Sequence, residues 1–279
     1  MQKSKIYCMC LHDHHLNNIK KLDYIPVGLG KNKFSNEWLK DSENLNISDK
    51  NPYYGEYTFY YWFWKNILSS LKDKTWIGFT GYRYHWSNND ILSSDELNKI
   101  INQENFKDHI LKKIPDKWNE YDVILGEEIN INNWKLSKIL KHGKKLFFKN
   151  PRYLLKKNRN IKLHFDAFHG EGILDKAIDV LDLQNRNDFR DFVNDKNSFN
   201  RENLFFCKSK TLMNNYFKSI FNWLYQCEKL FGFNLEGYSK KRLYAFLAER
   251  YISYWFQKNA KYLAWPIFFY DTNKNRITL

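Results

Sequence analysis

The most constraining feature of the chain is the aromatic run between Asn51 and Lys65. Asn51 and Pro52 are typical of a helix start, since Pro fits the first turn and Asn can cap it. The residues that follow are apolar on nearly every face, as in a buried helix. One interpretation is therefore an aromatic core helix. Glu56 is the one acid inside the run, and a buried acid there needs a partner.

A second interpretation places a ligand loop on each side of this helix. Residues 46–51 form a polar loop that leads into the helix N-terminus, where backbone N–H groups and the helix dipole favour an anion. Residues 75–80 predict a short buried strand, which ends in the polar and aromatic turn 81–86. Ligands of open α/β sheets bind beyond the carboxyl ends of the strands. Both loops are therefore candidate ligand contacts.

The remaining pattern alternates between short apolar runs and amphipathic segments. Residues 5–11 are apolar on both faces, which is typical of a central parallel strand. Gly28, in the segment 24–30, either lets backbone approach a ligand or forms a plain turn. By periodicity and cap residues we expect further strands at 121–125 and 203–208 and helices at 91–101, 171–182, 211–232 and 241–255.

The composition limits the class of protein. A chain of 279 residues with 43% hydrophobic residues is long enough for a full core, so we expect one domain, 1–279. Four cysteines in a chain of this length do not suggest a secreted disulfide framework, so a reduced, cytoplasmic protein is expected. We expect no signal peptide, since the first apolar run is short and ends at His12, and no transmembrane helix, since no apolar run of about 18 residues is present. The net charge of +14 favours anionic partners.

Much of the positive charge lies in residues 129–165, which contain no Asp or Glu. Aromatic residues and leucines are interleaved with the basic ones. Such a segment suits an anionic membrane surface or a lipid diphosphate, and it also suits single-stranded nucleic acid. A solvated basic face is the simpler alternative. The basic residues are Lys135, Lys138, Lys141, Lys144, Lys145, Lys149, Arg152, Lys156, Lys157, Arg159 and Lys162.

Several polar residues in the second half are candidates for chemistry. Asp166 and His169 share a face if their segment is helical, and His suits proton transfer near neutral pH, although a cap or packing role is the alternative. Asn203 opens an apolar strand, where it can bind a sugar hydroxyl or form a turn. Glu249 and Arg250 lie within an apolar helix. They form either a structural clamp or a site pair, since a buried ion pair is costly unless it is part of a network.

The order of these residues resembles a known family. From Asn46 the chain reads N-I-S-x-K-N-P-x-Y-x-E-x-T-x-x-Y-W-x-W-K-N, and W-I-G-x-x-x-Y-R follows at Trp76. Asn203 and the later R-x-x-A-F-x-x-E-R segment from Arg242 continue the likeness over most of the chain. The pattern is similar to a family once labelled only as a domain of unknown function. Its members occur in bacterial capsule and exopolysaccharide gene clusters and are regarded as glycosyltransferases.

The resemblance implies an α/β fold, a GT-A-like, Rossmann-type mixed sheet flanked by helices with a helical C-terminal part. It also implies a nucleotide-sugar-binding half at 1–128, the basic aromatic segment at 129–165 and an acceptor-side half at 166–279. The expected catalytic residues are Asp166, His169 and Glu249. The expected nucleotide-sugar-binding residues are His12, Gly28, Ser48, Lys50, Asn51, Tyr54, Glu56, Tyr82, Arg83, Asn203 and Arg250.

The implied reaction moves a sugar, from a donor that is UDP-linked by analogy, to a hydroxyl of a growing capsular, exopolysaccharide or lipopolysaccharide glycan. A galactofuranose donor is known within the family. The expected partners are the nucleotide sugar, a lipid-linked or oligosaccharide acceptor and, through residues 135–162, an anionic membrane surface. The protein would then be cytoplasmic and peripheral at the inner face of the membrane. No nucleic acid is expected.

The turn at 81–86 departs from the family pattern. The family usually has His-Tyr-Arg-Arg-Tyr there, whereas this chain has Gly81-Tyr-Arg-Tyr-His. The segment also lacks the Asp-x-Asp with which most GT-A enzymes hold a metal. We therefore expect no firm cofactor and no metal ligands, with Arg83 supplying positive charge, while Mn²⁺ or Mg²⁺ remains an alternative. The competing functions are a basic aromatic nucleic-acid-binding module and a catalytically inactive relative.

Overall fold

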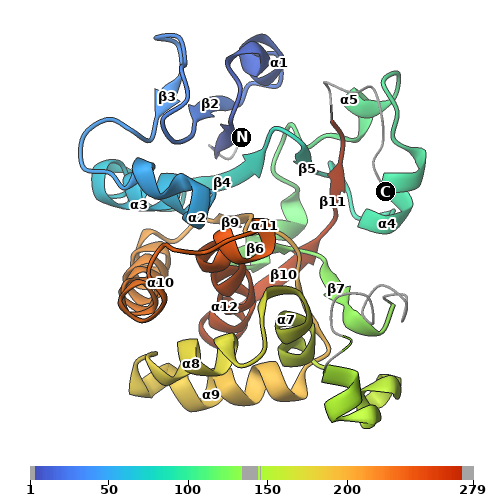
Figure 1. The fold of residues 1–279 in the computed structure, drawn as a ribbon. Helices are drawn as coiled ribbons and strands as arrows, with labels where there is room; N and C mark the ends of the chain where they lie inside the picture. The colour runs from blue at the N-terminus through green and yellow to red at the C-terminus, as the bar shows by residue number, and fades with distance from the viewer. Residues whose placement is uncertain (1–3, 134–143, 145, 272–279) are drawn as a thin grey trace.

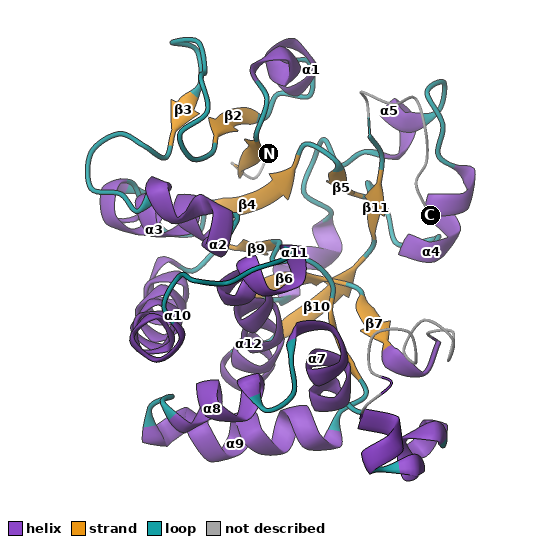
Figure 2. Cartoon of the chain, viewed as in Figure 1, coloured by secondary structure: helices purple, strands orange, loops and turns teal. Residues whose placement is uncertain are grey.

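The computed structural model describes residues 4–133, 144 and 146–271, and its centre is a seven-stranded sheet (Figures 1 and 2). The strand order is β3-β2-β1-β4-β9-β6-β10. These strands are β1 (Ser4–Cys10), β2 (Ile25–Gly28), β3 (Leu39–Lys40), β4 (Trp76–Gly81), β6 (Val123–Gly126), β9 (Phe205–Cys207) and β10 (Tyr262–Trp265). Two short ribbons join β5 (Tyr84–Trp86) to β11 (Ile267–Phe269) and β7 (Glu128–Asn130) to β8 (Ser198–Asn200).

Most neighbours in the large sheet are parallel. Strand β1 pairs in parallel with β2 and β4, and its residues 6–10 are buried. Strand β9 runs antiparallel to both β4 and β6, so the sheet is mixed. The carboxyl ends of β1, β2 and β4 meet at one edge. The expected α/β fold with a mixed sheet is therefore confirmed, and the edge that binds ligands in such sheets is defined.

Helices cover the sheet and build the C-terminal part. They are α1 (Leu16–Lys20), α2 (Asn51–Tyr54), α3 (Tyr57–Asn66), α4 (Ser94–Ile100), α5 (Phe106–His109), α7 (Ile161–His169), α8 (Ile173–Asp179), α9 (Leu183–Asp195), α10 (Lys210–Phe231), α11 (Tyr238–Lys241) and α12 (Leu243–Asn259). Helix α12 contacts α2, α9 and α10. Figure 2 shows α8 and α9 below α12 and α7 beside it, and α7, α8 and α9 contact one another as the expected helical C-terminal part.

The prediction of one continuous helix from Asn51 to Lys65 is wrong. A 3-10 helix (Ser48–Lys50) precedes α2, and Gly55 interrupts the chain between α2 and α3 with a φ of +57°. A side chain at Gly55 would meet the Arg242 guanidinium at 2.3 Å. Glycine is thus required both by the backbone conformation and by the close approach of Arg242. The break turns Glu56 toward α12.

The Asn51 side chain stabilises this break instead of capping a helix. Its amide donates to the Gly55 carbonyl at 2.9 Å and lies 3.1 Å from Thr58 Oγ1. Thr58 donates to the buried carboxylate of Asp41, which also accepts the Gly30 N–H at 2.8 Å. Burial raises the pKa of Asp41 to about 6. The aromatic run itself is core, as predicted, since most of α3 is buried.

Other predicted elements hold with small changes of boundary. Ser93 caps α4 in a capping box with Glu96. The amphipathic segments 211–232 and 241–255 correspond to α10 and α12. The segment around Gly28, however, is the strand β2 and no plain turn. A Cβ on Gly28 would meet the Phe34 ring at 2.5 Å, so this glycine is packed beneath an aromatic side chain.

The basic aromatic segment is described only in part, because residues 134–143 and 145 lie outside the described residues. These include Lys135, Lys138, Lys141 and Lys145. Two 3-10 helices follow, Pro151–Leu154 and Lys156–Asn158. Phe148, Leu154 and Leu155 are 76%, 45% and 53% exposed, so apolar side chains face solvent among the lysines. In the described part of the chain, no helix is long and apolar enough to cross a bilayer.

Candidate active site

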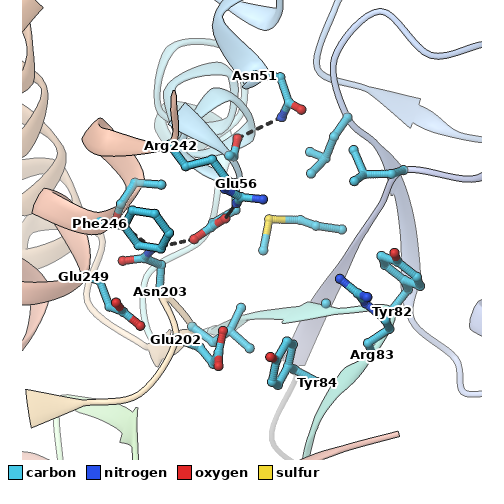
Figure 3. Close-up of a pocket in the computed structure, with 17 residues that line it drawn as sticks. Asn51, Glu56, Tyr82, Arg83, Tyr84, Glu202, Asn203, Arg242, Phe246 and Glu249 are labelled. Atoms are coloured by element: carbon cyan, nitrogen blue, oxygen red, sulfur yellow. Dashed lines mark hydrogen bonds and ion pairs between the residues drawn. The ribbon is translucent and has the colours of Figure 1, made fainter. Parts of the chain in front are cut away.

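A pocket of about 210 Å³ lies beyond the carboxyl ends of β1, β2 and β4 (Figure 3). Its other walls are the break between α2 and α3, the connection from β8 to β9, and the start of α12. Its lining residues are Met9, Leu11, Leu29, Asn51, Gly55, Glu56, Gly81, Tyr82, Arg83, Tyr84, Glu202, Asn203, Leu204, Arg242, Ala245, Phe246 and Glu249. We call it the carboxylate pocket, since three glutamates line it.

Glu56 is held in one wall by two side chains from other elements. Its Oε2 lies 3.2 Å from Arg242, and its Oε1 accepts a hydrogen bond from the Asn203 amide. Asn203 is itself fixed, because its amide also donates to the Ala245 carbonyl at 3.2 Å and its Oδ1 accepts from the Tyr57 hydroxyl at 3.3 Å. The predicted partner for the acid in the aromatic run is therefore present. Glu56 is a fixed negative charge of the wall.

Glu249 lines the pocket, and Arg250 lies behind it. The Arg250 guanidinium pairs with Glu249 Oε2, donates to the Phe246 carbonyl at 3.2 Å and lies 3.1 Å from His164 Nδ1. It also stacks over Phe199 at 4.6 Å. Only 2% of the Arg250 side chain is exposed. Burial raises the pKa of Glu249, while the charge of Arg250 opposes this rise.

Glu202 is the third glutamate, and it has an unusual backbone. Its φ of +57° places it in the left-handed region, which side chains other than glycine rarely adopt. Burial, together with the negative charges of Glu249 and Glu56, raises its pKa to about 8. A hydrogen bond with Tyr84 opposes the rise. The raised pKa favours the protonated carboxyl, which can donate a hydrogen bond.

Arg83 faces these carboxylates from the opposite wall. Figure 3 shows its guanidinium pointing into the pocket from the turn after β4, next to Tyr82 and across from Glu56 and Arg242. The guanidinium carbon lies 5.0 Å from the centre of the Tyr82 ring and 5.8 Å from that of Phe269. Among the described residues, its buried Nε has no hydrogen-bond partner. Arg83 therefore offers a positive charge to a ligand.

The pocket collects six of the predicted site residues from distant parts of the sequence. They are Asn51, Glu56, Tyr82, Arg83, Asn203 and Glu249. The other predicted site residues do not line it: His12, Gly28, Ser48, Lys50, Tyr54, Asp166, His169 and Arg250.

Lys50 and Tyr54 are both bound to α10. Their side chains contact the Glu228 carboxylate at 2.6 and 2.7 Å, so they join the α2 region to the helix behind it. Ser48 is buried, and its hydroxyl donates to Asn46 Oδ1 at 2.9 Å. These three residues belong to the loop predicted to bind an anion, but their side chains are engaged within the protein.

Asp166 and His169 lie on α7. Asp166 pairs with Lys162 at 2.7 Å and accepts the Gly172 N–H at 3.1 Å, so it fixes the turn from α7 to α8. Burial raises its pKa. His169 is buried, and its ring stacks on Phe246 at 4.1 Å. Because Phe246 lines the carboxylate pocket, His169 supports that wall from behind.

His12 is exposed at the end of β1. Its ring lies edge-on to Tyr82, with 5.6 Å between ring centres, so it lies near the turn that carries Arg83. Within the described residues, no group of three or more His, Cys, Asp or Glu is arranged to hold a metal ion.

Eleven lining residues were not among the predicted site residues, and four of these have charged or aromatic side chains: Tyr84, Glu202, Arg242 and Phe246. Arg242 and Phe246 belong to the same motif as Glu249, so their spacing along α12 was a usable signal. Glu202 had only a weak signal, an acid one residue before the predicted Asn203. Tyr84 lies in the 81–86 turn, but nothing in the sequence distinguished it from its aromatic neighbours.

Comparison with solved structures gives a match to the apo structure of the bifunctional glycosyltransferase WbbM. The identity is 20% and the TM-score 0.58, and the match covers 97% of this chain and 46% of that one. The likeness therefore shows a shared fold, and this chain spans about half the length of WbbM. No curated protein matches the chain. The family model described as "Domain of unknown function (DUF4422)" matches residues 5–260, and the chain therefore belongs to the DUF4422 family.

Proposed function

We propose that the chain is a glycosyltransferase. It moves a sugar from a nucleotide-sugar donor, UDP-linked by analogy and with galactofuranose as the first sugar to test, to a hydroxyl of a growing capsular, exopolysaccharide or lipopolysaccharide glycan. The fold shared with the bifunctional glycosyltransferase WbbM supports this assignment. One observation carries the proposal: three glutamates face Arg83 across a pocket at the carboxyl ends of β1, β2 and β4.

Glu249 is the proposed proton acceptor for the attacking hydroxyl. Glu56 is already bound by Arg242 and Asn203, and the pKa of Glu202 is raised to about 8. Burial raises the pKa of Glu249 as well, but the buried Arg250 on one of its oxygens opposes this rise and favours the ionised form. A carboxylate held by a positive charge and open to the pocket suits general base catalysis. Of the three catalytic residues predicted from the sequence, it is the one that lines the pocket.

Arg83 is the proposed group that stabilises the leaving diphosphate. Negative charge grows on the diphosphate as the bond to the sugar breaks, and a positive group already in place lowers the barrier. The raised pKa of Glu202 favours its protonated form, which can donate a hydrogen bond to a sugar or leaving oxygen, as buried carboxylic acids do in other enzymes. This arrangement needs no divalent ion to supply the charge, so we propose metal-independent transfer.

The acceptor is proposed to be lipid-linked and presented at an anionic membrane surface. The described part of the basic segment supports this, because Phe148, Leu154 and Leu155 are exposed among Lys144, Lys149, Arg152, Lys156 and Lys157. Apolar side chains that enter the headgroup region, next to lysines that contact anionic lipids, are the usual features of a peripheral membrane surface. The protein would then work at the cytoplasmic face of the membrane.

The first experiment is a thermal-shift screen of purified protein against UDP, GDP, CDP, dTDP and their sugars, with manganese or with chelator. A ligand that binds only the folded state raises the melting temperature. A hit is followed by measuring release of the diphosphate with the wild type and with Arg83→Ala. Turnover in chelator that Arg83→Ala abolishes would support the proposal. Strict dependence on added manganese would refute the metal-independent mechanism.

A nucleic-acid-binding module is the competing function. It accounts for the net charge and the basic segment, but it gives no role to Arg83 and the three glutamates. Nanomolar binding of oligonucleotides at physiological salt, together with no response to any nucleotide sugar, would favour it. A folded protein that binds a donor but never transfers the sugar would instead be an inactive relative, with the altered 81–86 turn as the first suspect.

A further inference from the structure

A second cavity, of about 480 Å³, lies on the other side of Tyr82 from the carboxylate pocket. Residues from α1, α5, β5 and the segment after β11 line it, and Figure 1 shows these elements together at one end of the molecule. Its volume falls in the range of about 300 to 1,000 Å³ that is usual for small-molecule sites. The carboxylate pocket, at about 210 Å³, is smaller than this range.

The lining of this cavity is positive. Lys21, Lys107 and Lys112 contribute to it, and no Asp or Glu is among its lining residues. Asp271, which follows the lining residue Tyr270, acts electrostatically on His15 in the floor. All three lysines are exposed, and within the described residues none of them is engaged in an ion pair. We call this site the lysine cavity.

The interior of the lysine cavity is aromatic. The rings of Phe106 and Tyr270 stack, with centres 4.5 Å apart and an interplanar angle of 25°. His85 packs edge-on against Phe106, with 4.9 Å between ring centres. Such surfaces are suited to a flat ring, because aromatic faces stack on nucleobases and similar groups.

His85 adds a buried imidazole to the floor of the lysine cavity. It is 3% exposed and lies among the residues that line the cavity. The backbone carbonyls of Tyr82 and Tyr270 lie close enough to favour a proton on the ring, although neither ring nitrogen reaches full hydrogen-bond geometry among the described residues. Burial lowers the pKa of His85 to about 3, so the ring is neutral. A neutral imidazole has one donor and one acceptor, and carbonyls can only accept, so the acceptor nitrogen of this buried ring is left for a donor on a ligand.

We propose that the lysine cavity is a second ligand site, for a small molecule that joins a flat ring to a phosphate, as a nucleoside phosphate does. The flat ring of the ligand packs against the stacked pair of Phe106 and Tyr270 and hydrogen-bonds to His85. Its phosphate contacts Lys21, Lys107 and Lys112. A bound ligand also touches Tyr82, which lines both sites, so its binding is coupled to the turn that carries Arg83. The inference holds whether or not the carboxylate pocket transfers a sugar.

The test measures binding of uridine monophosphate, adenosine monophosphate and inorganic phosphate by isothermal titration calorimetry. The wild type should bind at least one nucleoside monophosphate more tightly than phosphate alone. The double variant Lys107→Glu, Lys112→Glu should weaken this binding about ten-fold or more, since each 1.4 kcal/mol lost is a factor of ten. The matched control is Lys176→Glu, Lys218→Glu, which changes the same net charge at exposed positions of α8 and α10.

Three outcomes would overturn the inference. The first is that none of the probes binds the wild type at millimolar concentration. The second is that both double variants weaken binding equally, which indicates a general charge effect. The third is that Arg83→Ala removes binding while Lys107→Glu, Lys112→Glu does not, which places the nucleotide in the carboxylate pocket. The last outcome would leave the proposed glycosyltransferase function intact.

Discussion

Two arginine–glutamate pairs differ in what surrounds them, and their arginines are eight positions apart, with Arg242 directly before α12 and Arg250 within it. Arg242 pairs with Glu56 at the pocket wall, with side chains 30% and 20% exposed. Arg250 pairs with Glu249, and its side chain is 2% exposed. Both residues of the first pair line the carboxylate pocket, while in the second only the glutamate does so. The difference teaches that the same two residue types can form a binding wall at one end of a helix and a buried clamp farther along it.

The buried clamp has a specific consequence for Glu249. Arg250 is fixed by the Phe246 carbonyl, by His164 and by two aromatic rings, so it holds the Glu249 carboxylate in one place. Catalytic groups need such support from behind, because small displacements cost large factors in rate. In our proposal the motif combines the two alternatives: Glu249 acts in the pocket that it lines, and Arg250 supports it from behind.

The largest effect is expected from Glu249→Gln. If Glu249 accepts the proton of the acceptor hydroxyl, the amide should lower the turnover number by about 10² to 10⁴, the usual contribution of a general base. Steady-state kinetics with the donor found by thermal shift would measure this. Glu228→Gln is the control, since Glu228 binds Lys50 and Tyr54 away from the pocket. A Glu249→Gln enzyme within a factor of three of the wild type would disprove the assigned role.

The two pairs should differ most in how much they contribute to the free energy of unfolding. Arg250→Met leaves Glu249 without its buried partner, which should reduce the free energy of unfolding by about 3 to 5 kcal/mol. Arg242→Met breaks a partly exposed pair, and Glu56 keeps its bond from Asn203, so a loss of about 0 to 1 kcal/mol is expected. Urea unfolding of the two variants provides the measurement. Equal losses would mean that burial does not distinguish the pairs.

The protonation of Glu202 gives a pH-dependent prediction. Its pKa rises from the ordinary 4.5 to about 8 in the folded protein. Between these values the folded state holds a proton that the unfolded state has released, so this group makes stability fall as the pH increases. Urea unfolding at pH 5, 6.5 and 8 should show a shallower fall for Glu202→Gln than for the wild type. Parallel curves for the two proteins would show that Glu202 titrates normally.

The smallest effect is expected at Lys50, which the sequence placed in an anion-binding loop. Because its ammonium group lies 2.6 Å from Glu228, Lys50→Met should cost about 1 kcal/mol of stability or less and leave the donor KM within a factor of two. Chemical denaturation and kinetics test the two parts separately. A ten-fold rise in KM would restore Lys50 to the binding residues and move the donor toward the start of α2.

The sequence was most informative where the pattern is local. Alternation and buried apolar runs predicted β1 and β4, and helical periodicity with cap residues predicted α4, α10 and α12. The helix predicted at 51–65 is broken at Gly55, which lies inside the aromatic run and was visible in the sequence. The short strands β10 and β11 were missed, because three or four residues after a long helix carry too little periodicity to identify.

The sequence, together with its family resemblance, predicted the α/β class, the buried aromatic run and six of the residues that line the carboxylate pocket. Tyr82 and Arg83 are the clearest case, since they follow a predicted strand and ligands bind beyond the strand ends of an open sheet. The tertiary structure alone decided which partner each charge has. Glu56 meets Arg242 across 186 positions of the chain, and Glu202 joins Glu249 because a left-handed turn holds it there. Charge pairing and pKa depend on distance and burial in space, and spacing along the chain does not specify these.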